Sequence, residues 1–428
     1  MQVSVESGEG LQRRMTVELP ADQIEKAVTQ RLKQIGRTAR MDGFRPGKVP
    51  MNMLRRRYGG QVLQEVYGEM IENSYQEAID QEKLVPAGMP KIEPVKSAEE
   101  SVFAYVATLE VMPQIELAQL DGEITRPVAE ITDDDVTEMI EKLRKQRVTW
   151  NPVERGANEG DQIKINFKGL MEGEAFEGGS ANDIPLVLGS KSMIEGFEDG
   201  LIGVVKEEKR SLELQFPEDY RVEGLAGKPV TFEIEVNEVS EAILPEVDEA
   251  FAKEFGADEG VEKLKEDIRE NMLRELKHRV RAKVKHQVMD LIYNSNPIDI
   301  PSALVEEEIE AMRKQTRSQL RQGAGSIELP REMFEDQAKR RVSLGLLIAE
   351  IIKQQKIELD ADRVRETIEE YAASYETPEE VVKHYYGNRE QLAAVQNLVL
   401  EDQVVDWVLA QARVMDEQTT FTALTSQG

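Results

Sequence analysis

The stretch GDQIKINFKGLMEGEAFEGG, residues 160–179, first alternates apolar and polar side chains and then becomes rich in glycine. Ile163, Ile165 and Phe167 are each followed by a lysine or an asparagine. Because successive side chains of a β-strand point to opposite faces, this period of two predicts a strand with one buried face. The Gly178-Gly179 pair predicts a turn at the end of the stretch.

The segments that follow extend this pattern into a small sheet. Alternation recurs at residues 212–216 and 230–236, where Leu, Phe, Val or Ile occupies every second position. Between them, the short apolar segment MIEGFEDGL, residues 193–201, predicts a helix. We therefore expect residues 151–242 to form a small antiparallel β-sheet curled on one short helix.

The flanking parts of the chain have different patterns. At the N-terminus, strand-like alternation over residues 11–19 is followed by a helical stripe that includes Ile24, Val28 and Leu32. A linker holds a second short helix, which should begin near Thr132. From residue 243 onward the pattern is helical. The sequence thus predicts an α+β multidomain protein. Its parts are an N-terminal α+β domain (1–115), a linker with a helix (116–150), a β-sheet domain (151–242) and a helical C-terminal domain (243–428).

The composition excludes several classes of function. The formal net charge of -28 argues against a protein whose whole surface wraps nucleic acid. There is no cysteine, which excludes thiolate chemistry, and the three histidines are not spaced to chelate a metal. No signal peptide is recognisable, and no run of about 18 apolar residues predicts a membrane span. We expect no membrane partner, no metal and no cofactor, since a nucleotide-binding loop is also lacking.

Residues 31–57 are strongly basic within this acidic chain. They hold nine basic residues and one acidic residue, a local net charge of +8. This asymmetry favours a polyanionic partner, and Arg45 and Lys48 are suited to phosphate contacts. Phe44 lies between glycines and prolines in GFRPGKVP, residues 43–50, and is expected to be available for stacking or for a surface slot. From charge alone, a merely solvated helical hairpin is the alternative.

The segment GFRPGKVP resembles the ribosome-docking signature of the bacterial trigger factors, Gly-Phe-Arg-x-Gly-Lys-x-Pro, at all six specified positions. The resemblance implies that residues 1–115 form a ribosome-binding domain. Its loop would contact large-subunit protein and RNA near the exit tunnel. The ribosome-binding residues implied are Gly43, Phe44, Arg45, Pro46, Gly47, Lys48 and Pro50.

The β-rich part resembles the FKBP-type peptidyl-prolyl isomerases in its order of strands, its F-E-G-G turn and its Leu-Gly pair before the short helix. Isomerisation of an X-Pro bond crosses a barrier of about 18–20 kcal/mol because amide resonance is lost. A dry apolar pocket can favour the less polar twisted amide without any nucleophile. Glu177 replaces the family's usual aspartate, and Phe197 replaces its usual tryptophan. The catalytic wall implied by the resemblance consists of Phe167, Phe176, Met193, Ile194, Phe197, Tyr220 and Phe232.

The helical C-terminal part carries apolar side chains on long charged helices, which suits weak and promiscuous contacts. With the two resemblances, it indicates an ATP-independent, ribosome-associated chaperone that binds unfolded nascent polypeptides and isomerises X-Pro bonds. The trigger factor resemblance also implies a cytoplasmic protein, partly ribosome-bound, that is in a monomer–dimer equilibrium off the ribosome. The alternatives are a dedicated FKBP-type isomerase, whose helices serve dimerisation or targeting, and a pure RNA-binding protein.

Overall fold

The computed structural model describes residues 1–39, 41, 44, 48–95, 102–171, 173–220, 222, 224–320, 329–373, 375 and 377–426. The chain divides into two compact units, each made of separate segments. The first unit joins Met1–Arg126 to Ala282–Asp416, and the second joins Pro127–Arg281 to Glu417–Gly428. Among the described residues, no helix is both long enough and apolar enough to cross a membrane.

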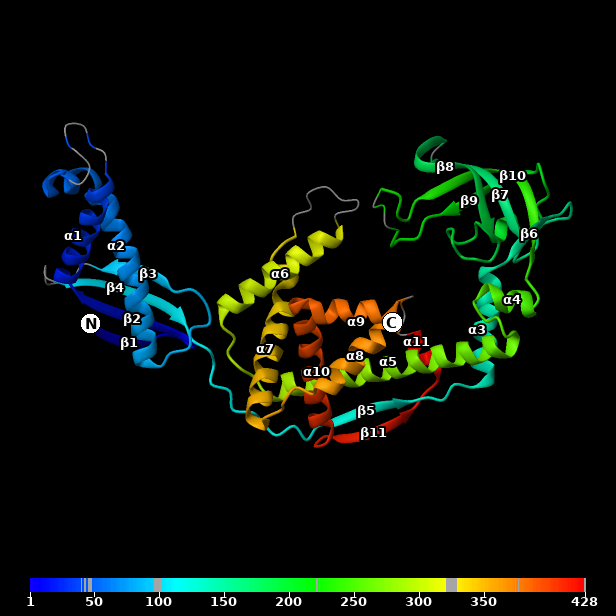
Figure 1. Cartoon of the computed structure of the whole chain (residues 1–428). Coiled ribbons are helices and arrows are strands. Elements are labelled where there is room, and N and C mark those ends of the chain that lie inside the picture. Colours follow the sequence, from blue (N-terminus) through cyan, green and yellow to red (C-terminus); the bar gives the residue numbers. More distant parts are fainter. Residues whose placement is uncertain are drawn as a thin grey trace. The chain divides into compact units, whose positions relative to one another are not determined.

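The first unit begins with an antiparallel sheet of order β1-β2-β4-β3 and two helices that follow β2 (Figure 1). Met15, Val17 and Tyr105 of the sheet are buried together with Ala78 and Ile79 of the second helix. The alternation predicted near the N-terminus is thus confirmed as a sheet with a helix-covered face. The elements are β1 (Gln2–Ser7), β2 (Gln12–Pro20), α1 (Ala21–Thr38), α2 (Met51–Glu82), β3 (Lys91–Val95) and β4 (Val102–Glu110).

The helical stripe of α1 is also confirmed. Ile24, Val28 and Leu32 are buried against Leu54 and Val62 of α2. The three side chains are four residues apart, so they lie along one face of the helix. This packing holds α1 and α2 side by side (Figure 1).

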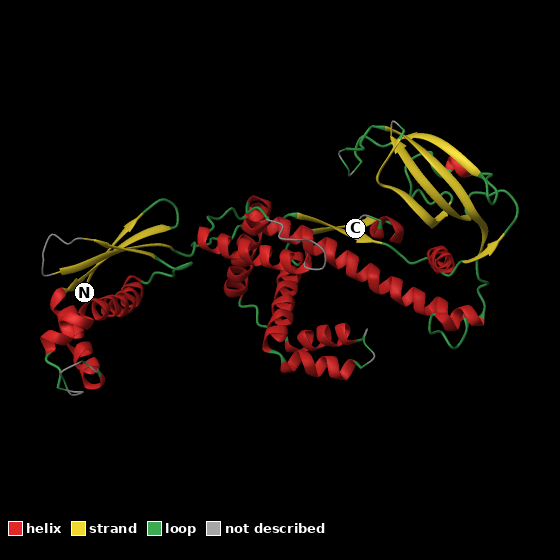
Figure 2. Cartoon of the chain, turned by 90° about the horizontal axis from the view of Figure 1, so that it is seen from above, coloured by secondary structure: helices red, strands yellow, loops and turns green. Residues whose placement is uncertain are grey.

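The β-rich part of the second unit is an antiparallel sheet, yellow in Figure 2 and labelled in Figure 1. Its strand order is β6-β10-β7-β8, with β9 paired to β10. Strands β7 and β10 pair so that Phe232 lies opposite Gly169 and Ile234 lies opposite Phe167. This register brings aromatic side chains from distant segments into one core. The strands are β6 (Thr149–Pro152), β7 (Gln162–Met171), β8 (Glu174–Val187), β9 (Lys209–Gln215) and β10 (Pro229–Ile243).

The short helix predicted over residues 193–201 is limited to the 3-10 turn η1 (Asp199–Leu201). The residues before it form turns, and Gly196 has a φ of +84°. A right-handed helix cannot continue through a residue with positive φ, so the apolar pattern of this segment serves core packing instead. Phe197 and Leu201 are accordingly among the fully buried side chains.

The second unit also has a helical core, which is formed by segments that precede and follow the β-domain in the sequence. It contains α3 (Asp133–Gln146), α4 (Glu249–Glu254), the first part of α5 (Val261–Ser295) and α11 (Phe421–Thr425). The predicted helix start at Thr132 is confirmed by a capping box. The Thr132 hydroxyl accepts from the Asp135 N–H at 3.2 Å, and the Asp135 carboxylate accepts from the Thr132 N–H at 2.8 Å.

The first unit ends in a group of helices, most of which follow the predicted helical pattern. A separate two-stranded sheet was not predicted. β5 (Glu123–Val128) lies in the expected linker and pairs with β11 (Arg413–Gln418), where only helix was expected. The helices are α6 (Ser302–Leu320), α7 (Glu332–Gln355), α8 (Ala361–Ala372), α9 (Pro378–Gly387) and α10 (Arg389–Leu409).

Candidate functional site

Three phenylalanines form the centre of the β-domain. The Phe197 and Phe232 ring centroids are 5.1 Å apart, and Phe167 lies 6.0 Å from each of them. All three pairs are edge-to-face, with interplanar angles between 68° and 83°. This geometry places the positive edge of one ring on the negative face of another, which fixes the orientation of the cluster.

Phe176 reaches the same cluster because two glycines make room for its ring. A Cβ atom on Gly169 would lie 2.6 Å from the ring, and so would one on Gly179. These distances are too short for any larger residue, so both glycines are required for the close approach. Phe176 also meets Phe216 edge-to-face at 6.0 Å, and Phe216 packs on Tyr220 at 4.6 Å.

All seven side chains of the predicted wall belong to one apolar cluster. They differ in depth, since Phe197 is 1% exposed and Phe232 is 6% exposed. Phe167, Phe176, Met193, Ile194 and Tyr220 are half-buried. The two deep rings therefore form the base of the cluster, and the other five side chains reach the surface. The side chain of Glu177 lies outside the described residues.

Phe216 is the one aromatic member of the described cluster that was not included in the predicted wall. It is buried, and it joins Phe176 to Tyr220. The alternation of residues 212–216 placed it on the inner face of a strand. Only its contacts across the domain show that it supports the same group of residues.

The basic segment holds an exposed aromatic side chain. Phe44 is 37% exposed, and its N–H donates to the Met41 carbonyl at 3.0 Å. Lys48 and Pro50 are exposed as well. The other predicted docking residues lie outside the described residues, namely Gly43, Arg45, Pro46 and Gly47.

Of the described basic side chains in residues 31–57, two are neutralised by ion pairs. Arg55 pairs with Glu25 at 2.7 Å, and Arg31 approaches Glu65 at 3.5 Å. Five further cations form no ion pair with any residue that the structure describes, and all five are exposed. They are Lys33, Arg37, Lys48, Arg56 and Arg57. This end of the first unit therefore presents a positive surface that its own carboxylates leave largely unbalanced.

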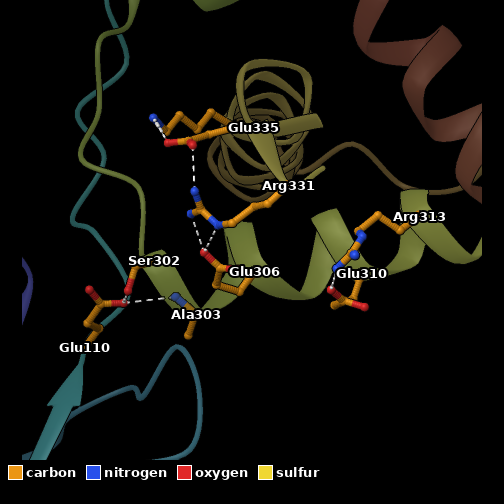
Figure 3. Close-up of polar contacts among 9 residues, drawn as sticks. Glu110, Ser302, Ala303, Glu306, Glu310, Arg313, Arg331 and Glu335 are labelled. Atoms are coloured by element: carbon orange, nitrogen blue, oxygen red, sulfur yellow. Dashed lines mark hydrogen bonds and ion pairs between the residues drawn. The ribbon is translucent and has the colours of Figure 1, made fainter. Parts of the chain in front are cut away.

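The C-terminal helices are joined by an ion-pair network at the start of α7 (Figure 3). The Arg331 Nε donates to Glu306 of α6 at 2.9 Å, and its second terminal nitrogen also contacts that carboxylate. Its other terminal nitrogen donates to Glu335 at 2.6 Å. The hydrogen bond from Arg331 lowers the pKa of Glu306, and the hydrogen bond from Lys339 lowers the pKa of Glu335. Both carboxylates are thus stabilised in their ionised form.

The first turn of α6 receives a carboxylate from the N-terminal sheet. Glu110, the last residue of β4, accepts from the Ser302 hydroxyl at 2.9 Å and from the Ala303 N–H at 3.2 Å (Figure 3). The carboxylate satisfies a free N–H of the helix start and matches the positive end of the helix dipole. Sequence reasoning missed Glu110, because its partners are 192 residues or more away along the chain.

Comparison with known proteins covers nearly the whole chain. The profile "Bacterial trigger factor protein (TF)" matches residues 1–143, and the profile of that family's C-terminus matches residues 260–410. The trigger factor of Thioalkalivibrio sulfidiphilus is 46% identical over 99% of this chain and 98% of its own length. That of Stutzerimonas stutzeri is 48% identical over 98% of this chain and 97% of its own length. The chain belongs to the trigger factor family.

The profile "FKBP-type peptidyl-prolyl cis-trans isomerase" matches residues 153–237, which is the sheet that contains the aromatic cluster. As a trigger factor, the protein is a ribosome-associated chaperone that carries an FKBP-type peptidyl-prolyl isomerase domain. It binds ribosomes and nascent chains as this family does. The predicted α+β multidomain fold is confirmed, and the alternative of a dedicated isomerase is not favoured, since trigger factor profiles match on both sides of the isomerase domain.

Proposed function

We propose that the loop around Phe44 docks this chaperone on large-subunit protein and RNA near the exit tunnel. The observation that carries the proposal is an exposed Phe44 ring in the same segment as exposed cations that have no ion-pair partner among the described residues. Lys48 and Arg45 would contact phosphate, and Phe44 would enter a slot or stack on a base. Pro46 and Pro50 would limit the loop's freedom, so less entropy would be lost on docking. Gly43 and Gly47 would allow tight turns there.

Co-sedimentation with ribosomes tests this docking. Changing Phe44, Arg45 and Lys48 together to Ala should abolish pelleting at moderate salt, with unchanged thermal unfolding. Met89→Ala is the matched control, because Met89 is an apolar side chain of the same domain that is 99% exposed and lies outside the basic segment. Pelleting of the triple variant at the wild-type level would exclude the loop as the docking site.

We also propose that the aromatic cluster holds the proline of a nascent chain. The half-buried Phe167, Phe176 and Tyr220 would contact the proline ring, together with Met193 and Ile194. The deep Phe197 and Phe232 would form the floor. In this apolar setting the twisted amide, whose resonance and polarity are reduced, loses less solvation than the planar amide, so the barrier to rotation is lowered. No step requires an acid, a base or a cofactor.

Isomerisation of a short proline peptide tests the second assignment. Tyr220→Ala and Phe197→Leu should each reduce kcat/KM at least tenfold while the domain stays folded. Phe251→Ala is the matched control, because Phe251 is a buried phenylalanine of the separate helical core. Wild-type rates in both cluster variants would remove these residues from the site.

The remaining expectations stand as parts of the same proposal. The ranges 1–115, 116–150, 151–242 and 243–428 would act as ribosome-binding domain, linker, isomerase and chaperone body. The protein would work in the cytoplasm, partly ribosome-bound, and form a homodimer when free. Resemblance to the family supports these points, and sedimentation of the purified protein over a range of concentrations tests the dimer.

A further inference from the structure

A buried carboxylate lies directly beside the floor of the proposed isomerase pocket. Glu198 follows Phe197 and is 7% exposed. One of its oxygens accepts from the Ser192 N–H at 2.8 Å, the Met193 N–H at 3.2 Å, the Ser190 hydroxyl at 3.1 Å and the Ser192 hydroxyl at 3.3 Å. Its other oxygen accepts from the Lys191 N–H at 3.0 Å. One side chain therefore gathers five donors from a single loop.

The loop that these bonds hold has an unfavourable backbone. Lys191 has a φ of +56°, in the left-handed region that a side chain with a Cβ atom rarely adopts. Lys191 and its neighbours Ser190 and Ser192 are exposed, so little apolar packing fixes them. The carboxylate of Glu198 is the group that gathers three successive N–H donors across this turn. Without it, the left-handed conformation loses its main local support.

The ionised form of Glu198 is suited to this task. Burial would raise the pKa of this carboxyl, but the N–H groups of Lys191 and Met193 and the hydroxyl of Ser190 donate to it, and its pKa is lowered overall. The carboxylate is an acceptor on both oxygens. A glutamine would place an NH2 group against one set of N–H donors, and at least one donor would be left without an acceptor.

The end of the same loop forms part of the proposed wall. Met193, the last of the residues whose N–H reaches Glu198, and the adjacent Ile194 both pack on the aromatic cluster. We propose that Glu198 is a positioning residue for isomerisation, which holds Met193 and Ile194 in place at the pocket through the turn at residues 190–193. The inference rests on the proposed pocket and adds to it a residue that does not touch the substrate.

If the loop is ordered in only a fraction of the molecules, only that fraction can bind substrate, and the apparent affinity falls in proportion. Glu198→Gln in the full-length protein should therefore raise KM for a proline peptide about tenfold and leave kcat near the wild-type value. Hydrogen exchange should accelerate at the amides of residues 191–193 and stay unchanged in β7 and β10. Glu195→Gln is the matched control, because Glu195 is an exposed glutamate of the same segment.

Two further variants keep the test decisive. Lys191→Asn in the Glu198→Gln background should lower KM part of the way back to the wild-type value, because asparagine tolerates the left-handed region better than lysine does. Ser190→Ala with Ser192→Ala keeps the carboxylate and its N–H donors. This double variant should raise KM about threefold, and it replaces Glu198→Gln if that variant fails to fold.

The outcomes separate this inference from the pocket proposal. If Tyr220→Ala and Phe197→Leu lower activity but neither Glu198→Gln nor the serine double variant changes KM, the pocket stands and the positioning role is overturned. Faster exchange throughout the domain, or a lower kcat at unchanged KM, would also overturn it by indicating a general structural role. If the Tyr220 and Phe197 variants keep wild-type rates, the pocket proposal fails independently of Glu198.

Discussion

Phe44 and Phe197 are both central to proposed functions, and they lie in opposite surroundings. Phe44 is 37% exposed, in a basic segment whose cations are mostly unpaired among the described residues. Phe197 is 1% exposed and packs edge-to-face on two other rings in a domain core. The same side chain thus serves an external partner in one region and an internal scaffold in the other.

The difference indicates how each region can be altered without loss of the fold. An exposed ring contributes little to folding, so its substitution should change binding alone. A buried ring contributes through packing, so its substitution should lower the stability of the domain and its activity together. Electrostatic docking should also depend on salt, whereas the apolar cluster should not. Each prediction below tests one part of this contrast.

The largest effect is expected for Phe232→Ala. Phe232 is 6% exposed and contacts the rings of Phe167 and Phe197, so its removal leaves a cavity that should cost about 3–5 kcal/mol. Hydrogen exchange in β7 and β10 should report this loss, and isomerase activity should fall with it. Ribosome pelleting should persist. Ile202→Ala, at a 46% exposed position of the same domain, should change little, and lost pelleting in Phe232→Ala would contradict the separation of the two regions.

The two regions also differ in how far the sequence predicted them. The proposed docking loop is contiguous in sequence, so its charge and its eight-residue signature could be recognised locally. The aromatic cluster combines strands that are distant in the chain, and its members were predicted only through the resemblance to an isomerase family. Phe216, which completes that cluster, was missed because a period of two shows that a residue points inward but not what it meets.

Other features were not predicted from the sequence for the same reason. Glu198 carries no visible signal, since its role depends on a turn whose conformation is set by Lys191 and Gly196. The pairing of β5 with β11 joins segments almost 290 residues apart, as the Arg126–Asp416 ion pair at 2.7 Å across the two strands shows. Local periodicity predicts elements, whereas long-range pairing and helix caps such as Glu110 are visible only once the chain is folded.

The next largest effect concerns binding alone. Phe44→Ala should weaken ribosome binding by about 1–3 kcal/mol, the contribution of an aromatic ring that stacks on a base. A ring that fills a surface slot and buries a similar area should contribute a similar amount. Thermal unfolding should not change, because the ring is exposed. Lys48→Ala should reduce the slope of log affinity against log salt by about 1, whereas Phe44→Ala should leave that slope unchanged. A lower melting temperature for Phe44→Ala would show that the ring is structural after all.

A smaller effect is expected for Glu110, whose carboxylate caps the start of α6. Glu110→Ala removes the acceptor of the Ser302 hydroxyl and the Ala303 N–H, and should destabilise the start of α6 by about 1 kcal/mol. Hydrogen exchange at the first turn of α6 should report it. Glu116→Ala, which removes an exposed glutamate nearby, is the control. Slower or unchanged exchange at Ala303 would contradict the capping role.

The smallest effect is expected for the exposed ion pair of Arg331 and Glu306. The hydrogen bond from Arg331 lowers the pKa of Glu306 below its ordinary value of 4.5. The stabilisation is therefore present above the pKa of the unfolded chain and is lost as pH falls through the lower pKa of the folded state. Glu306→Gln should remove this acid-dependent part of the stability of the α6–α7 contact, which hydrogen exchange between pH 6 and pH 3 would measure. In the wild-type protein, added salt should make this pH dependence weaker. The change should be slight because water screens the pair. A loss as large as that of Phe232→Ala would break the contrast, since exposed charges would then serve folding as much as buried rings do.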